Sequence, residues 1–561
     1  MLSLGSYIGG VEQPGRRWVY TLRSSAMLSD FFGAVRVKRG LERGRLSPDE
    51  VGTDVIGRCA VADRDDMEAA LQAAARAVDT WAGAAPATRM RVVEEFHHLV
   101  REKQDALVDL MIAEGHPRSL ARWQVAGMLA ATGAATRDFL AGQLEYRVRD
   151  GARELRVRRV ADGVVCLNPP QNATVSNALL GIWALAAGNA LVVRAPRSAP
   201  LGVMYALREL VAPALERAGA PAAALSVLCS DAGATVEQWL ASPLVDDIMY
   251  FGGSEQGIAF GAQCTARGKK PVLELAGNDI CVVWHDADLD LAAEALAEAF
   301  YGSGQICMVP NCAVVHPRVA DELLAKLAAR AAAIRPGPPE APDALLSPVL
   351  RTDRFNDVLR QAVEAGAELV CGGRRLDVDG RPDDVRGLFL EPTVIRVDGL
   401  KGARELDAVR HETFFPLLPV VVPEELPDDE LLTLVTEFVN SNEYGLRNSL
   451  WTGDEETAEL FLRRVRNGGL LKVNDSHIGF LPVLPTHGGT GLTGGPGGEA
   501  NYPLLRTSHL QGVSVAHGVR PADAVFAQPA DDDRLGGDGR FSDENRLGDE
   551  NRLGGDKEVP L

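Results

Sequence analysis

A regular alternation of strand-like and helix-like segments constrains the fold of this chain more than any other feature of its sequence. Short apolar runs that predict strands lie at residues 163–167, 190–194, 224–229 and 247–251. Segments with the apolar spacing of helices lie between them, at residues 178–187 and 200–218. Strands that alternate with helices of this length form a parallel sheet. We therefore expect an α/β fold with a doubly wound parallel sheet, which binds ligands at the carboxyl ends of its strands.

One predicted strand end carries a turn suited to a phosphate group. Phe251 ends the strand, Gly252 and Gly253 follow, and Ser254 is expected to cap the next helix. Backbone N–H groups at such a helix start can hold a pyrophosphate. The turn is not part of a G-x-G-x-x-G motif, the usual signature of a dinucleotide site. By itself it fits a turn that binds nothing equally well.

Helical segments precede this sheet, and a second α/β region follows it. The helical spacing covers residues 67–81, 89–114 and 120–144, and the second region covers residues 274–475. Two alternating runs, 144–149 and 154–160, flank Asp150-Gly151. This pattern predicts a β-hairpin, and its many arginines indicate that it lies outside the main sheets.

Composition excludes several functional classes. A chain of 561 residues holds two or three domains, and no segment approaches the ~18 apolar residues of a membrane span. A net charge of −19 argues against nucleic acid as a partner. The eight cysteines include no C-x-x-C pair, which argues against a disulfide framework or a zinc site. We expect no metal, and a cytoplasmic protein, since residues 1–20 lack a signal-peptide core.

Cys307 is the residue best placed for covalent chemistry. It follows Gly302 and Gly304 in a loop of small residues, which leaves room for a substrate carbon to reach the sulfur. Glu274 stands upstream as a candidate base. A nucleophile and a base are the minimal equipment for catalysis through a thioester. The alternative is a buried cysteine that packs as a small apolar residue.

The last part of the chain, residues 521–561, differs from the rest. The sequence Asp-Glu-Asn-Arg-Leu-Gly occurs there twice in tandem, at 543–548 and 549–554. The segment holds eleven acidic and five basic side chains and few large apolar ones. This composition predicts a disordered acidic tail.

Four motifs, in order along the chain, resemble those of the aldehyde dehydrogenase superfamily. They are Glu274-Leu275-Ala276-Gly277, Gly304-Gln305-Ile306-Cys307, His411-Glu412-Thr413-Phe414-Phe415-Pro416 and Asn442-Glu443-Tyr444-Gly445-Leu446. In the third motif Phe415 stands where the family usually has glycine. The resemblance covers residues 55–517 and favours a catalytic Cys307 over a merely structural one.

The resemblance implies a cofactor-binding domain, a catalytic domain and a small β oligomerisation arm. The expected segments are the N-terminal part of the cofactor domain (1–143), the oligomerisation hairpin (144–160), the rest of the cofactor domain (161–273), the catalytic domain (274–475), a return segment with the partner strand of the arm (476–520) and the tail (521–561). An arm that pairs across an interface implies a homodimer or homotetramer.

The resemblance also implies roles for the site residues. Cys307 would attack an aldehyde as a thiolate, so we expect its surroundings to favour the thiolate. Asn172 and the Cys307 backbone N–H would stabilise the oxyanion. Hydride transfer to the cofactor would leave a thioester, and Glu274 would activate water to hydrolyse it.

The implied cofactor-binding residues show one informative departure. They are Leu167, Pro170, Gln171, Arg194, Pro196, Arg197, Gly253, Ser254, Glu412 and Phe414. The family commonly has lysine at position 194 and glutamate at position 197, which grip the adenosine ribose. Arg197 attracts a 2′-phosphate where a glutamate repels it. We therefore expect NADP to be favoured over NAD; the alternative is that Arg197 points to solvent.

The sequence leaves two other functions open. The spacing from Asn172 to Gly188-Asn189 and the Gly252-Gly253 doublet are similar to the CoA-acylating branch of the family. A CoA-acylating dehydrogenase, or the reverse acyl-CoA reductase, is therefore the nearest alternative to hydrolysis. The second is a catalytically silent oligomeric scaffold.

The substrate aldehyde is not specified by the sequence. Trp183, Tyr301 and Met308 are the apolar residues expected to line its site. The glycine-rich stretch 488–498 is expected to be flexible.

Overall fold

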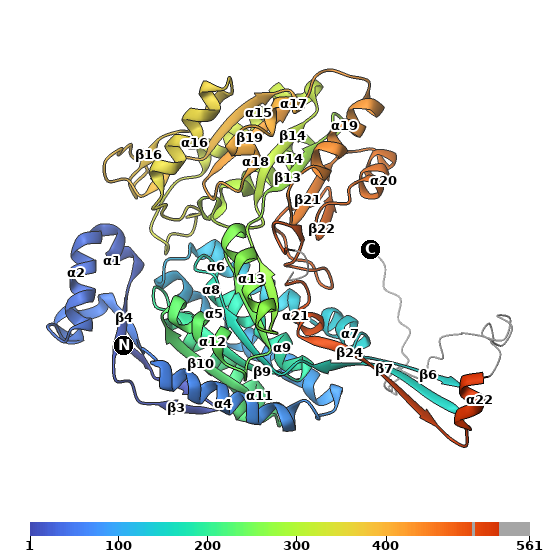
Figure 1. The fold of residues 1–561 in the computed structure, drawn as a ribbon. Coiled ribbons are helices and arrows are strands. Elements are labelled where there is room, and N and C mark those ends of the chain that lie inside the picture. The colour runs from blue at the N-terminus through green and yellow to red at the C-terminus, as the bar shows by residue number, and fades with distance from the viewer. Residues whose placement is uncertain (496–499, 527–561) are drawn as a thin grey trace, which may run out of the picture. The chain divides into compact units, whose positions relative to one another are not determined.

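The structure is a computed structural model that describes residues 1–495 and 500–526 (Figure 1). It forms two compact units. The larger unit comprises Met1–Tyr146 and Val157–Gln511, and the smaller comprises Arg147–Arg156 with the chain from Gly512 onward. The described residues contain no helix that is long and apolar enough to cross a membrane.

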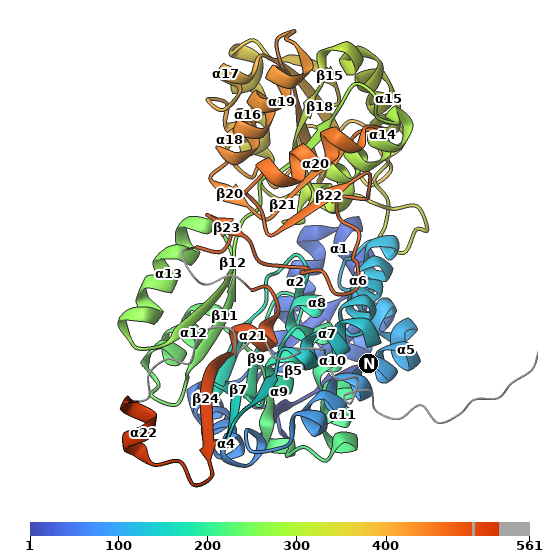
Figure 2. The ribbon, with the colours of Figure 1, turned by 90° about the vertical axis from the view of Figure 1, so that its right-hand side faces the viewer.

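A seven-stranded sheet forms the first half of the larger unit (Figures 1 and 2). Its strand order is β12 (Lys270–Glu274), β11 (Asp247–Phe251), β8 (Val164–Asn168), β9 (Ala190–Pro196), β10 (Leu225–Ser230), β2 (Ser6–Ile8) and β3 (Val11–Gln13). The five strands from β12 to β10 are parallel, whereas β2 joins antiparallel. The surrounding helices are α4 (Arg64–Trp81), α5 (Pro86–Ala113), α8 (Thr174–Leu179), α9 (Gly181–Ala187), α10 (Leu201–Ala206), α11 (Ala212–Ala218), α12 (Ala232–Ala241) and α13 (Ser254–Ala266). This arrangement confirms the expected α/β fold.

A second seven-stranded sheet forms the other half of the larger unit. Its order is β15 (Glu368–Cys371), β18 (Thr393–Asp398), β19 (Leu417–Val422), β14 (Pro310–Val315), β13 (Asp279–Val283), β21 (Arg447–Trp451) and β22 (Leu470–Val473). Alternate residues of β13 enter different cores: Ile280 and Val282 pack in one cluster, Cys281 and Val283 in another. Both faces of this strand are therefore buried, as is usual in parallel sheets. The covering helices include α14 (Leu289–Ala297), α15 (Ala320–Ala333), α16 (Thr352–Glu364), α19 (Asp428–Asn440) and α20 (Glu455–Arg464).

Two of the predicted helices are broken. Residues 120–144 form α6 (Arg118–Ala131) and α7 (Ala134–Gly142) with a break at Thr132-Gly133, where the Arg137 guanidinium donates to the Thr132 carbonyl at 2.8 Å. Residues 200–218 contain a π-helical turn, Leu207–Val211, just before Pro213. Proline lacks the N–H that would continue an α-helical hydrogen-bond ladder. Apolar spacing alone does not reveal such breaks.

Apart from β2 and β3, residues 1–60 build a small subdomain that the sequence patterns did not resolve into elements. Strands β1 (Leu2–Leu4), β5 (Val55–Ala60) and β4 (Trp18–Leu22) form a three-stranded sheet. Between β4 and β5 the chain forms α1 (Ser24–Ser29), α2 (Phe31–Glu42) and α3 (Pro48–Val51). Tyr20, Leu22, Ala34, Leu41 and Val55 form its separate apolar core.

The predicted hairpin is present as β6 (Glu145–Asp150) and β7 (Arg153–Ala161), and β24 (Ser508–Ala516) completes a three-stranded sheet. Within the smaller unit, Glu154 pairs with Arg156 at 2.7 Å and with Arg147 at 3.7 Å. The expectation of disorder from residue 521 is wrong for its first six residues, because Pro521–Phe526 form helix α22. The repeats of the acidic tail lie outside the described residues.

Candidate functional site

Cys307 lies at the end of an unusual backbone path between the two sheets. Gly302, Ser303 and Gly304 have φ angles of 61°, 58° and 69°, a left-handed conformation that glycine adopts without strain. The non-glycine member, Ser303, is held there by two hydrogen bonds. Its hydroxyl donates to the Ser347 carbonyl at 2.6 Å and accepts from the Ser347 N–H at 3.0 Å. The path fixes where the following residues, up to Cys307, can lie.

Two glycines allow the backbone to close around this loop. A Cβ atom on Gly277 would lie 2.0 Å from the Cys307 carbonyl oxygen, and one on Gly304 would lie 2.0 Å from the Phe415 carbonyl oxygen. Neither contact is possible for a larger residue. The motifs around Glu274 and Phe415, far apart in the sequence, thus pack directly on the Cys307 loop.

Glu274 occupies the carboxyl end of strand β12, opposite Phe251 of β11. Its side chain is buried, and its Oε2 accepts a hydrogen bond from the Gly488 N–H at 2.7 Å. Gly488 belongs to the glycine-rich stretch, where Cβ atoms on Gly489 and Gly491 would also collide with the backbone at Gly445 and Glu443. Gly488, Gly489 and Gly491 therefore allow close packing of the backbone. The expectation of a flexible turn does not fit these close contacts.

Asn172 reaches the same loop from the other side. It lies between β8 and α8, and its side-chain amide donates to the Gln305 carbonyl at 2.9 Å. Gln305 is held in turn, since its amide donates to the Pro348 carbonyl at 2.9 Å. The structure thus brings together Asn172, Glu274 and Cys307, the three residues expected to be catalytic.

The electrostatics of Cys307 differ from the expectation. The thiol is half-buried, and burial raises its pKa well above the ordinary value. The nearby carboxylates of Glu274, Glu412 and Asp279 raise the pKa further, and only Arg447 lowers it. Surroundings that favour the thiolate were expected and are not found, because burial, reinforced by three acidic groups, outweighs the effect of one guanidinium.

Glu412 is held beside this loop. Its carboxylate accepts from the Gly277 N–H at 3.0 Å. Burial raises the pKa of Glu412 to about 8, against the lowering effect of that hydrogen bond and of Arg354. Phe414, two residues on, has a φ of 60°, which is unusual for a bulky residue. The motif that contains both residues is thus fixed against the Cys307 loop.

Aromatic rings that the sequence patterns did not single out lie around Cys307. Trp123 of α6 stacks on Phe480 with ring centroids 4.8 Å apart. Both pack with Tyr301, Ile306 and Cys307 in one cluster. Of the residues expected to line the substrate site, Tyr301 and Met308 belong to this cluster. The prediction for Trp183 is wrong, since this residue is buried in the core of the first sheet. The sequence analysis did not identify Trp123 as a site residue. It lies in α6, far from Phe480 in the sequence, so no local pattern connects the two rings.

The carboxyl ends of β8, β9 and β11 present the expected cofactor residues. Leu167 and Pro196 are buried, Pro170 is half-buried and Gln171 is exposed. The N-cap of α13 is Gly253, with extended φ and ψ of −68° and 148°, and Ser254 is the first helical residue. The expectation that Ser254 caps the helix is therefore wrong.

This helix start nevertheless fits a pyrophosphate. The buried Ser254 hydroxyl has no hydrogen-bond partner among the described residues. A Cβ atom on Gly253 would meet nothing within 4 Å, so the space beside the turn is open. A buried donor next to free backbone N–H groups suits a phosphate oxygen.

The two arginines of β9 and its following loop have different surroundings. Arg194 is buried and donates to the Asn168 side chain at 2.5 Å and to the Ser230 carbonyl at 3.2 Å. Arg197 is exposed and lines a cavity of about 350 Å³. Only Arg197 is therefore free to meet a ligand with its guanidinium.

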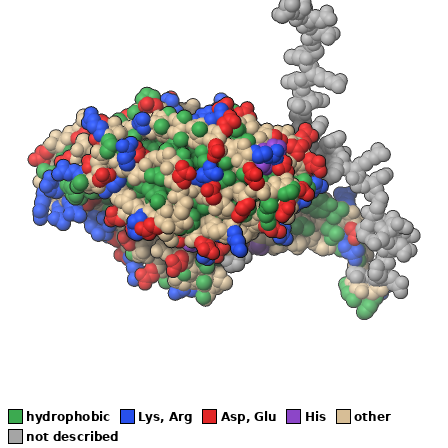
Figure 3. All heavy atoms as spheres, turned by 90° about the horizontal axis from the view of Figure 1, so that it is seen from above, with side chains coloured by type: hydrophobic (Ala, Val, Ile, Leu, Met, Phe, Trp, Pro, Cys, Tyr) green, Lys and Arg blue, Asp and Glu red, His purple; other side chains and the backbone are tan. Residues whose placement is uncertain are grey.

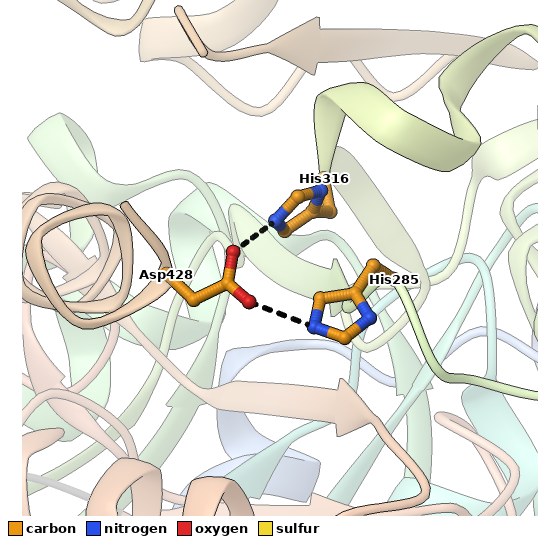
Figure 4. Close-up of side chains that lie close together, drawn as sticks. All are labelled: His285, His316 and Asp428. Carbon is orange, nitrogen blue, oxygen red and sulfur yellow. Dashed lines mark hydrogen bonds and ion pairs between the residues drawn. The ribbon is translucent and has the colours of Figure 1, made fainter. Parts of the chain in front are cut away.

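Among the described residues, His285, His316 and Asp428 form the one group that resembles a metal centre (Figure 4). The two imidazole Nε2 atoms lie 3.0 and 3.2 Å from the carboxylate oxygens, which Arg318 also contacts at 2.5 Å each. The Arg318 N–H donates to His316 Nδ1 at 3.2 Å, which leaves the proton of a neutral His316 on Nε2. The ring thus turns an N–H toward Asp428, and we interpret the group as an ion-pair network.

Comparison with known proteins decides the family. The profile of the Aldehyde dehydrogenase family matches residues 46–505. The chain belongs to the aldehyde dehydrogenase family. It is therefore an oxidoreductase that acts on aldehydes with NAD or NADP.

Individual relatives of this aldehyde dehydrogenase are distant but extensive. Benzaldehyde dehydrogenase YfmT of Bacillus subtilis is 27% identical over 466 residues, which cover 81% of this chain and 90% of the relative. Vanillin dehydrogenase of Corynebacterium glutamicum is 30% identical over 438 residues, covering 76% and 85%. The crystal structure of an NAD-dependent aldehyde dehydrogenase from Sinorhizobium meliloti superposes with a TM-score of 0.75 at 22% identity, covering 92% and 95%.

Proposed function

We propose that this aldehyde dehydrogenase oxidises aromatic aldehydes to carboxylic acids through a thioester on Cys307 that water hydrolyses. The observation that carries the proposal is the convergence of Asn172, Glu274 and Cys307 on one loop, with the carboxylate of Glu274 fixed by the Gly488 N–H at 2.7 Å. This arrangement supports a reaction that uses a nucleophile, an oxyanion donor and a base together.

The first step is attack by sulfur on the aldehyde carbon. The Cys307 proton leaves to solvent water as the C–S bond forms, so that the Glu274 carboxylate stays ionised for the hydrolysis step. The new C–S bond leaves charge on the former carbonyl oxygen. The Asn172 amide, whose nitrogen carries a second N–H besides the one given to Gln305, can donate to that oxygen.

Glu412 and Phe414 would hold the nicotinamide end of NAD(P)⁺, which would supply the acceptor for the hydride whose loss turns the hemithioacetal into the thioester. Glu274 then takes a proton from water, which attacks the thioester carbon, and the C–S bond breaks to release the acid and free Cys307. The hydrogen bond from Gly488 keeps the carboxylate at the end of β12 through both steps.

The substrate class follows from the aromatic wall. Trp123 and Phe480 stack beside Cys307, and a planar ring can extend such a stack at a typical gain of ~0.5–1.5 kcal/mol. Two of the relatives are named as benzaldehyde and vanillin dehydrogenases, which supports an aromatic substrate. Steady-state rates with benzaldehyde and with an aliphatic aldehyde test this substrate class. Equal kcat/KM values for the two aldehydes would contradict a preference for aromatic substrates.

We propose NADP as the favoured cofactor, because Arg197 is exposed at the carboxyl end of β9 and Arg194 is not. Glu412 and Phe414 are proposed at the nicotinamide end, beside the Cys307 loop. Parallel kinetics with both cofactors test this preference. Equal or higher kcat/KM with NAD would contradict it.

Acyl transfer to CoA is the second candidate, favoured by the short Asn172 to Gly188 spacing and the Gly252-Gly253 doublet. The fixed position of Glu274 supports hydrolysis instead. Acid release without CoA supports the proposal, and acyl-CoA formed at the expense of acid would overturn it.

We also propose a homodimer or homotetramer built through the β6–β7–β24 sheet. Light scattering on the purified protein measures its molar mass, and therefore its oligomeric state, directly.

A further inference from the structure

A polar cavity of about 350 Å³ joins the N-terminal subdomain to the end of strand β9. Arg16, Arg17 and Arg197 line it, together with Trp18 and the half-buried Glu42. The family profile begins only at residue 46. The cavity therefore combines Val61 and Arg197, which lie within the profile, with a wall of residues that precede it.

The charge of this cavity favours an anion. Arg16 is paired with Asp63 at 3.0 Å, whereas Arg17 and Arg197 make no ion pair with any described residue. Both are exposed. Glu42 is the only acidic residue of the lining. The two unpaired guanidinium groups therefore outnumber the one carboxylate, which leaves a net positive charge at the cavity.

The segment around the cavity is basic in an acidic chain. Residues 14–46 hold eight basic and two acidic side chains, although the net charge of the whole chain is −19. Figure 3 shows Lys and Arg side chains gathered at the end of the molecule's upper face where helix α2 lies in Figure 1. Burial lowers the pKa of Lys38 on that helix, and the charge of Arg197 adds to the effect. Lys38 itself lines a separate cavity, with Glu114 and Ser198.

The backbone holds Arg17 beside the cofactor sheet. The Arg17 carbonyl accepts from the Val61 N–H at 2.9 Å, and Val61 bridges to Cys229 of β10. β10 in turn pairs with β9 up to Pro196, the residue before Arg197. Arg17 and Arg197 are thus anchored to neighbouring strands at the same edge, where a doubly wound sheet binds its ligand.

We propose that Arg17 and Arg197 together form the site for the 2′-phosphate of NADP(H), so that the N-terminal segment determines cofactor specificity. The inference rests on the proposed use of NADP. A phosphomonoester carries close to two negative charges at neutral pH and pairs well with two guanidinium groups. Arg17 acts on binding and has no role in the chemical steps at Cys307.

Binding of fragments tests the site without catalysis. Calorimetry on the full chain compares 2′,5′-ADP with 5′-ADP for the wild type, Arg17→Gln, Arg197→Gln and the double variant. Arg36→Gln, an exposed arginine of α2 outside the cavity, is the matched control. We expect each single change to weaken 2′,5′-ADP about tenfold or more, with binding of 5′-ADP and the control variant unchanged. Arg17→Lys should restore part of the affinity, because it keeps the charge.

Different failures separate the two proposals. If Arg197→Gln weakens 2′,5′-ADP and Arg17→Gln does not, the role of Arg17 is wrong while NADP use stands. If the wild type binds 5′-ADP as tightly as 2′,5′-ADP, both proposals fail. Inorganic phosphate is the third probe: binding that depends on Arg17 but is not displaced by 2′,5′-ADP would assign the cavity to a separate phosphorylated ligand and overturn the inference.

Discussion

The backbone N–H of Gly488 donates to the Glu274 carboxylate over 2.7 Å. This bond joins the glycine-rich stretch to the end of β12. Nearby, Thr493 donates from its hydroxyl to the Ala276 carbonyl at 2.8 Å and accepts, through its own carbonyl, from the Leu275 N–H at 2.8 Å. The return segment therefore clamps the whole Glu274 to Ala276 strand end. These bonds hold the buried Glu274 carboxylate at the end of β12.

Removal of the base should separate the two halves of the reaction. We expect Glu274→Gln to lower kcat by about 10²–10⁴, the usual contribution of a general base. Stopped-flow absorbance should still show a burst of reduced cofactor, because the amide leaves Cys307 and Asn172 in place. An unchanged kcat would contradict the role of Glu274, and loss of the burst would move its role to the first step.

Gly277 should tolerate no side chain. A Cβ atom there would lie 2.0 Å from the Cys307 carbonyl oxygen, and overpacking of this kind costs at least ~1–3 kcal/mol. We expect Gly277→Ala to lower the melting temperature by several degrees and to abolish activity. Gly402→Ala is the matched control, because its Cβ would meet nothing within 4 Å and lies in helix α17 (Leu400–Ala403). Equal melting temperatures for the two variants would show that the contact does not exist.

Glu412 should make stability depend on pH. Its pKa rises from the ordinary 4.5 to about 8 in the folded protein, so its contribution to stability is full below 4.5 and is lost as the pH rises to 8. Glu412→Gln removes this loss. The difference in melting temperature between Glu412→Gln and the wild type should therefore increase from pH 5 to pH 9, in favour of the variant. Glu425→Gln, at an exposed position, serves as the control, and a pH-independent difference for Glu412→Gln would refute the burial of this carboxyl group.

The aromatic wall should discriminate between substrates. Replacing Phe480 by alanine removes the partner that stacks on Trp123. We expect kcat/KM for benzaldehyde to fall about tenfold relative to that for an aliphatic aldehyde, the scale of one lost aromatic contact. Phe139→Ala, at an exposed ring that contacts Tyr502, should leave this ratio unchanged. A parallel fall for both aldehydes in Phe480→Ala would mean that the ring only supports the fold.

Many of the helices and strands were predictable from local sequence patterns. Strand β11 begins and ends at Asp247 and Phe251 as expected, because a short apolar run between turns has few alternatives. The motifs that contain Glu274, Cys307 and Glu412 also fold onto one loop as the resemblance implied.

The features that the sequence did not reveal depend on contacts between distant segments. Trp123 meets Phe480 across more than 350 residues of chain, so no window of sequence shows the pair. The raised pKa of Cys307 results from burial and from carboxylates on other elements. The N-terminal cavity, likewise, exists only because Val61 ties Arg17 to the sheet that carries Arg197.

The thioester on Cys307 is the central claim, and mass spectrometry of the Glu274→Gln variant tests it most directly. The variant is mixed with benzaldehyde and NADP⁺, quenched in acid and digested. We predict a benzoyl adduct on the peptide that contains Cys307, absent when NADP⁺ is omitted and absent in a Glu274→Gln, Cys307→Ser double variant. A turnover that leaves Cys307 unmodified, or an adduct on another cysteine, would contradict the account.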